Sequence, residues 1–194
     1  MRTLWFLAAG TLLVGTVTST VNGPVGSGWS FPEETVRLDI LEGSFVVRAE
    51  YVFVAGRDAE PMPLLLRFPK DETLREPQLL EAGITCRTAS RPLPVVMGAD
   101  GWRFVLSGAG PQTCRVAIAY YQPMSCSRAV YILRSAREWG RALKKAVLEV
   151  RVPEDTECTI RPTLEPAGSE DGWRIYRGSF ENWLPREDLV VELR

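Results

Sequence analysis

Four cysteines are the residues with the clearest chemical potential in this chain. They are Cys86, Cys114, Cys126 and Cys158. An even number of cysteines favours disulfide bridges if the chain enters an oxidising compartment. A zinc site is disfavoured, because the sequence has no histidine and no Cys-x-x-Cys pair. Free buried thiols are the remaining alternative.

The strand pattern favours one pairing of these cysteines over the others. Cys86 and Cys114 lie in strand-like segments on either side of a candidate hairpin, whereas Cys126 lies in a connection and Cys158 opens a short strand. We therefore predict the bridges Cys86–Cys114 and Cys126–Cys158. Pairing of Cys86 with Cys158 and of Cys114 with Cys126 is the alternative.

The absence of histidine also limits catalysis. Histidine is the usual general base at neutral pH and the commonest metal ligand, so Ser-His-Asp, Cys-His and most catalytic zinc sites are excluded. The glycines at 108–110 match no phosphate-binding or dinucleotide motif and indicate a turn. We expect no catalytic, cofactor-binding or metal-binding residues, and a protein that is not an enzyme.

Carboxylate pairs are the acid–base chemistry that remains, because a glycosidase needs two acids at a suitable separation. The candidates are Glu33 with Glu34 and Glu154 with Asp155. Each pair is adjacent in sequence, which favours solvated loop charges over a catalytic pair. A carboxylate-dependent hydrolase of carbohydrate or cell-wall material stays open as an alternative.

Tryptophan and tyrosine side chains could instead stack against sugar rings. Trp173 and Tyr176 fall on opposite faces of one predicted strand, so one of them could point outward. The competing interpretation is that Trp102, Trp139, Trp173 and Trp183 fill the core or close its ends. We favour the core interpretation and keep carbohydrate binding as an alternative.

The N-terminus indicates export. Arg2 precedes an apolar run from Leu4 to about Val17, followed by small polar residues, which is the layout of a secretory signal peptide. The run is shorter than the roughly 20 residues of a spanning helix, so no membrane span is expected in the mature chain. We predict a signal peptide at 1–19, a flexible segment at 20–30, one domain at 31–194, and a periplasmic or secreted location.

Charge suggests no partner. The sequence has 23 Lys and Arg against 24 Asp and Glu, a net charge of −1. Such a balance gives no attraction to nucleic acid or to an anionic membrane. We expect no nucleic-acid binding.

Alternating apolar and polar residues predict many short strands separated by Gly and Pro clusters. The segments with this pattern are 36–40, 45–53, 64–68, 95–97, 102–106, 114–121, 129–133, 147–152, 158–161, 173–176 and 189–193. Sheets with one apolar face must hide it against another layer. We predict an all-β, two-sheet antiparallel sandwich, immunoglobulin-like in general architecture. Ser135 and Glu138 have capping-box spacing and allow at most one short helix.

Several segments resemble a family of secreted bacterial β-sandwich proteins of unknown function. The segments that carry the resemblance are Tyr51 to Phe53, Phe68-Pro69, Tyr131 to Pro153, and a tail with Phe180, Asn182, Trp183, Pro185, Asp188 and Leu189. The resemblance implies export and a sandwich fold, and it brings no catalytic or binding residue. The four cysteines are not part of the family pattern.

These observations favour a non-enzymatic extracytoplasmic module. We expect it to bind, or structurally support, another envelope or secreted protein. A carbohydrate or cell-wall binding module is the alternative. Outward tryptophans on one sheet face would favour carbohydrate, two convergent acids in a cleft would favour a hydrolase, and an apolar patch on a polar surface would favour protein binding.

Overall fold

The computed structural model describes residues 28–99, 101–108 and 110–194. Its strands are β1 (Trp29–Leu41), β2 (Ser44–Ala55), β3 (Met62–Leu66), β4 (Gln78–Cys86), β5 (Ala89–Pro92), β6 (Val96–Gly98), β7 (Gly101–Leu106), β8 (Gln112–Pro123), β9 (Arg128–Tyr131), β10 (Leu143–Pro153), β11 (Cys158–Arg161), β12 (Glu165–Glu170), β13 (Trp173–Trp183) and β14 (Leu189–Leu193). A short 3₁₀ helix, η1, covers Arg134–Trp139.

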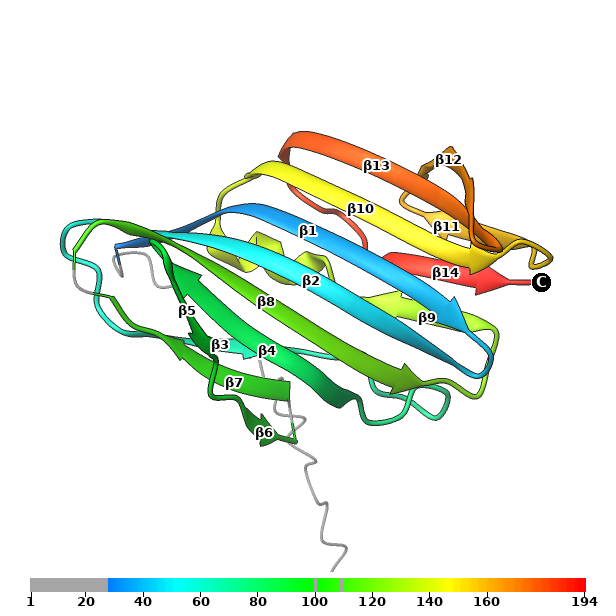
Figure 1. Ribbon diagram of the computed structural model, residues 1–194, viewed down its shortest axis with the longest axis horizontal. Coiled ribbons are helices and arrows are strands. Elements are labelled where there is room, and N and C mark those ends of the chain that lie inside the picture. Colours follow the sequence, from blue (N-terminus) through cyan, green and yellow to red (C-terminus); the bar gives the residue numbers. More distant parts are fainter. Residues whose placement is uncertain (1–27, 100, 109) are drawn as a thin grey trace, which may run out of the picture.

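The strands form three sheets in two layers. The main sheet has eight strands in the order β12-β13-β10-β1-β2-β8-β4-β5. Two three-stranded sheets cover it: the β7 sheet, ordered β3-β7-β6, and the β14 sheet, ordered β11-β14-β9 (Figure 1). The predicted all-β sandwich is confirmed. The second layer differs from the single second sheet that we predicted, because it consists of two separate three-stranded sheets.

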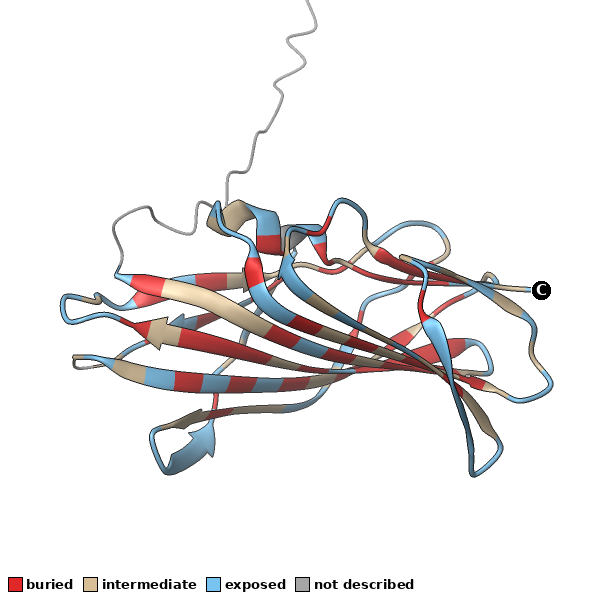
Figure 2. Cartoon of the chain, turned by 90° about the horizontal axis from the view of Figure 1, so that it is seen from above, coloured by how far each residue is buried: buried red, intermediate tan, exposed pale blue. Residues whose placement is uncertain are grey.

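Strand pairing is antiparallel apart from β1, which runs parallel to β10. Buried and exposed residues alternate along the long strands (Figure 2). In β8, for example, Cys114, Val116, Ile118 and Tyr120 are all buried, while Arg115 and Ala117 are exposed. The buried set faces the two small sheets and forms one continuous core with them.

The predicted helical turn is present, but it begins at Arg134 and lacks the predicted capping box. The capping box does not form, because the residue before η1 is Leu133 and no side chain caps the helix. Glu138 instead accepts a hydrogen bond from Nη1 of Arg67 at 3.1 Å. The turn ends at Gly140, whose φ of 65° is the left-handed conformation that glycine adopts without strain.

One of the two predicted disulfides is present. Cys86 and Cys114 face each other on β4 and β8 and are bridged, so this pairing is confirmed. The predicted Cys126–Cys158 bridge is wrong, since both cysteines are free thiols. Their separation explains this: β14 lies between β9 and β11, so the chain around Cys126 and that around Cys158 are about two strand spacings, or ~10 Å, apart.

The predicted signal peptide at 1–19 lies outside the described residues. The first strand begins at Trp29, inside the segment 20–30 that we expected to be flexible. Trp29 is anchored, because it pairs with Ala55 and its indole N–H donates to the carbonyl oxygen of Glu60 at 2.7 Å. Among the described residues, no helix is long and apolar enough to span a membrane.

Candidate functional site

The outer face of the β7 sheet carries a group of exposed apolar side chains. Strand alternation buries Trp102 and Phe104 and turns Arg103 and Val105 outward. Register places Val105 opposite Pro63 on β3. It also places Arg103 between Leu65 of β3 and Val96 of β6. We call Pro63, Leu65, Val96 and Val105, together with Arg103, the β7 strip.

The exposure of this strip is unusual for large apolar side chains. Val96 and Val105 expose 67% and 52% of their surface. Isolated exposed apolar residues are common, but neighbours on one face remove much more surface from water when a partner covers them. β6 is also an edge strand, since no other strand of the described residues pairs with its outer side.

An aromatic pocket lies beside the strip. It is a cavity of about 60 Å³ between the main sheet, the β7 sheet and η1, and it is lined by Phe31, Tyr51, Phe53, Leu64, Leu65, Leu66, Phe104, Glu138 and Trp139. Leu65 belongs to both the strip and the pocket lining. The volume suits the tip of one apolar side chain or a few water molecules.

A buried polar cluster adjoins this pocket through Tyr51. The Tyr131 hydroxyl donates to Oε1 of Glu34 at 2.8 Å and shares a second 2.8 Å hydrogen bond with the Tyr51 hydroxyl. The interpretation of Glu34 as a solvated loop charge is therefore wrong. Glu34 is 3% exposed and lies in β1 on the inward face, because the strand begins earlier than the alternating residues indicate. Its neighbour Glu33 lies on the opposite face, half-buried.

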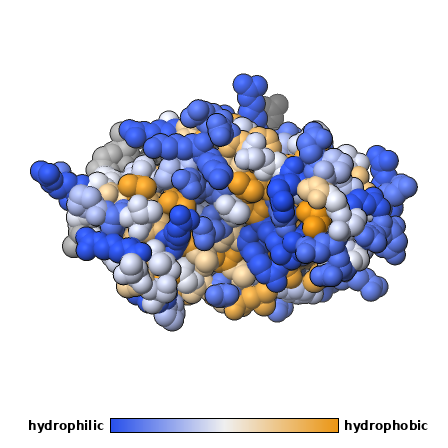
Figure 3. All heavy atoms as spheres, turned by 45° about the horizontal axis from the view of Figure 1, so that its top comes forward, coloured by the Kyte–Doolittle hydropathy of each residue, from blue (hydrophilic) through white to orange (hydrophobic). Residues whose placement is uncertain are grey.

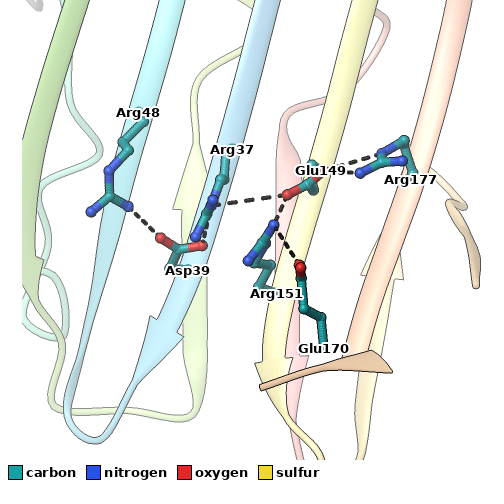
Figure 4. Close-up of polar contacts among 7 residues, drawn as sticks. All are labelled: Arg37, Asp39, Arg48, Glu149, Arg151, Glu170 and Arg177. Carbon is teal, nitrogen blue, oxygen red and sulfur yellow. Dashed lines mark hydrogen bonds and ion pairs between the residues drawn. The ribbon is translucent and has the colours of Figure 1, made fainter. Parts of the chain in front are cut away.

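A row of ion pairs crosses the outer face of the main sheet (Figure 4). Asp39 accepts hydrogen bonds from Arg37, at 2.7 Å, and from Arg48. Glu149 accepts from Arg151 at 2.8 Å and from Nε of Arg177 at 3.1 Å. These residues share one face because β2, β1, β10 and β13 are adjacent and in register.

Glu149 is the centre of this row. Arg37 also approaches it, with Nε 3.9 Å from Oε1. Partial burial alone would raise the pKa of Glu149, but hydrogen bonds from Arg177 and Arg151 outweigh burial and hold the pKa below its ordinary value. The carboxylate therefore stabilises the fold at neutral pH, and this contribution is lost as pH falls through its folded-state pKa.

We expect Glu149→Gln to lower the free energy of unfolding at pH 7 by about 1 to 2 kcal/mol, because two charge-assisted hydrogen bonds are weakened. Thermal melts at low and high salt measure this, and the difference from wild type should shrink in salt. Glu170→Gln is the control, since Glu170 is a more exposed, more distant partner of Arg151. Equal losses in the two variants would contradict a central role for Glu149.

Solved zinc peptidases share this architecture. An M1 zinc metallopeptidase from Deinococcus radiodurans is similar over 85% of this chain and 42% of its own, with a TM-score of 0.55 at 12% identity. A two-domain M1 zinc metallopeptidase bound to L-tryptophan is similar over 85% of this chain and 43% of its own, with a TM-score of 0.53 at 12% identity. The chain thus spans less than half the length of these proteins. No protein-family model and no curated protein matches the sequence.

At 12% sequence identity, the similarity to these peptidases shows a shared fold. This chain contains no histidine, so it lacks the usual ligands of a catalytic zinc ion. Within the part of the chain that the structure describes, no group of three or more Cys, Asp or Glu side chains is placed to hold a metal ion. The resemblance to secreted sandwich proteins of unknown function stays a prediction.

Trp102, Trp139 and Trp183 lie in or against the core, whereas register with Pro153 places Trp173 on the face of β13 that carries Arg177. Trp102 is fully buried, and Trp139, Trp173 and Trp183 are half-buried. Tyr176, on the inward face of β13, is half-buried too. None of the tryptophans in the described ranges stands fully exposed as a sugar-stacking platform would require.

The outer face of the main sheet is mostly hydrophilic, with smaller apolar areas between charged side chains (Figure 3). A shallow hollow of about 330 Å³ lies over Ala117 and Ala119, with Glu50 and Glu81 among its walls. These two acids stand on β2 and β4, which β8 separates, and Glu50 is paired with Arg115 at 2.8 Å. The predicted acid pair Glu154 and Asp155 lies apart from the hollow in an exposed turn.

Proposed function

We propose that this chain is a non-enzymatic, extracytoplasmic β-sandwich module that binds or structurally supports another envelope or secreted protein. The observation that carries the proposal is the β7 strip, where Val96 and Val105 are more than half exposed beside Leu65 and Pro63. Covering such a strip removes apolar area from water, which is the main driving force of protein association. The apolar side chains of the strip fit a partner surface that is itself apolar.

Two further observations favour the proposal that the chain structurally supports another protein. The chain spans less than half of the similar solved proteins, one of which is a two-domain peptidase. In those proteins, a β-rich unit of this fold is therefore joined to further parts of the chain. The chain also contains no histidine, so its own residues lack the usual ligands of a catalytic zinc ion.

An extracytoplasmic location is part of the proposal. The Cys86–Cys114 bridge is of a kind that persists in oxidising compartments. The apolar run from Leu4 to about Val17 supports export by a signal peptide. Intact mass of the protein recovered from periplasm or culture fluid tests this, with a mature N-terminus expected between about residues 18 and 28.

The alternative functions gain less support. Sugar binding would be favoured by outward tryptophans, and a hydrolase by two convergent acids in a cleft. The half-buried tryptophans and the open, ion-paired hollow near Glu50 match neither arrangement well. We therefore propose neither activity.

Site-specific cross-linking tests the docking surface. A photo-reactive residue at position 96 should give discrete protein adducts in intact cells, and Val105→Asp should abolish them by placing a charge in the covered area. The matched control is the same photo-reactive residue at Leu80, which is 58% exposed but lies on β4 of the main sheet. Equal adducts from both positions, or none from position 96, would contradict docking through the strip.

A further inference from the structure

We propose that Glu34, Tyr51 and Tyr131 form a proton-dependent latch between the two layers of the sandwich, and that the latch loosens when Glu34 loses its proton. Glu34 and Tyr51 come from adjacent strands of the main sheet and are direct cross-strand neighbours. Tyr131 comes from β9 at the edge of the β14 sheet. The hydrogen bond between Glu34 and Tyr131 therefore joins the layers.

The latch is fully enclosed by protein. Glu34, Tyr51 and Tyr131 are 3%, 6% and 2% exposed. One carboxyl oxygen of Glu34 accepts from Tyr131, whereas Oε2 is buried and receives no hydrogen bond from the described residues. A carboxylate with two oxygens and one donor is poorly satisfied, and the neutral acid tolerates such a site far better.

Burial is the dominant electrostatic influence on this group. It raises the pKa of Glu34 from 4.5 to about 7, although the hydrogen bond from Tyr131 acts in the opposite direction. Burial also raises the pKa of Tyr131 well above its ordinary value, with the Glu34 charge adding to the effect. Both tyrosines therefore stay neutral across the range in which Glu34 titrates.

The charged groups on neighbouring elements do not neutralise Glu34. On β10 the residue in register with Glu34 is Ala146, and Lys145 next to it points to the other face with Glu33. On η1, Glu138 is paired with Arg67, and Arg134 is paired with Asp188. On β8 the ionisable side chain that faces this cluster is Tyr120. Its electrostatic interactions are with Tyr51 and Tyr131.

The direction of the pH effect follows from the raised pKa. Because folded Glu34 holds its proton more tightly than unfolded Glu34, its stabilising contribution is complete below pH 4.5 and is lost as pH rises through about 7. Each pH unit in this window lowers the folding equilibrium constant by up to about tenfold. Above the window the charged carboxylate weakens the contact of β9 and of the adjoining η1 with the main sheet.

The test compares pH 5 with pH 8 in wild type and in Glu34→Gln, whose amide keeps the shape but does not titrate. In wild type, hydrogen exchange corrected for its intrinsic pH dependence should accelerate at pH 8 in β9 and η1 more than in β2 and β8. In Glu34→Gln this selective acceleration should vanish. Glu33→Gln is the matched control, since it removes the adjacent carboxylate on the opposite face and should behave like wild type.

A direct titration makes the result independent of how the variants fold. The carboxyl ¹³C resonance of Glu34 in wild type should shift with a midpoint near 7. A midpoint at or below about 5 would overturn the proposal. So would exchange that accelerates evenly over all strands, or selective acceleration that persists in Glu34→Gln.

Discussion

Replacing both Cys86 and Cys114 by alanine should lower the free energy of unfolding by about 3 to 4 kcal/mol. The bridge closes a segment with a sequence separation of 28 residues, so breaking it frees the unfolded chain to sample many more conformations. The closed segment contains β5, β6 and β7, which include most of the β7 strip. We therefore expect the loss to reach the proposed docking surface as well as overall stability.

Urea unfolding of the double variant, followed by far-UV circular dichroism, measures this loss. The matched control replaces Cys126 and Cys158 by alanine, which removes two free, half-buried thiols and should change the unfolding free energy much less. Non-reducing peptide mapping gives the pairing itself. A peptide that joins Cys126 to Cys158, or equal losses in the two double variants, would contradict the arrangement described above.

Trp102→Ala should lower the free energy of unfolding by about 3 to 5 kcal/mol, the range for a large aromatic side chain removed from a core. Trp102 is fully buried, and its ring centroid lies 4.4 Å from that of Phe68 and 5.8 Å from that of Tyr120. This aromatic cluster joins the β7 sheet to β8 of the main sheet. Its loss leaves a cavity at the contact between the two layers.

Trp102→Phe separates packing from hydrogen bonding. The buried indole N–H of Trp102 donates to no acceptor among the described residues. Replacement by phenylalanine therefore removes ring volume without breaking a hydrogen bond. We expect it to lower the free energy of unfolding by roughly half as much as alanine does, or less. Trp173→Ala, at a half-buried position, is the control and should cost less than Trp102→Ala in urea unfolding. Equal losses for Trp102→Ala and Trp173→Ala would contradict the core assignment.

Alternation of apolar and polar residues predicts burial best where one face of a strand is buried. Alternation in β8 follows burial closely, since Cys114 to Tyr120 bury every second side chain. Alternation predicts least at exposed edges. All residues of β12 are exposed, as are those of β5, so neither strand has a hydrophobic pattern that a sequence could reveal. Both strands are held by backbone pairing, β12 with β13 and β5 with β4.

The candidate surface could be predicted only in part. Val96 and Val105 occur in recognisable strands, but alternation does not tell whether an apolar residue faces the core or the solvent when both faces carry one. Register with β3 and the burial of Trp102 decide that Val105 points outward. The same limit applies to Glu34, whose inward position depends on where β1 begins and on the arrival of Tyr131 from the other layer.

The amino-acid sequence by itself determined the all-β class and the missing histidine chemistry, because period-two burial is a local property and composition needs no structure. It favoured the Cys86–Cys114 bridge but left another pairing open, and the pairing of β4 with β8 decided between them. Tertiary structure alone decided that Cys126 and Cys158 stay apart, that Glu34 is enclosed, and that the second layer is split into two sheets. The reason is physical: each of these depends on which distant strands become neighbours. In this chain β1 pairs with β10 and β14 inserts between β9 and β11, and local alternation carries no information about such pairings.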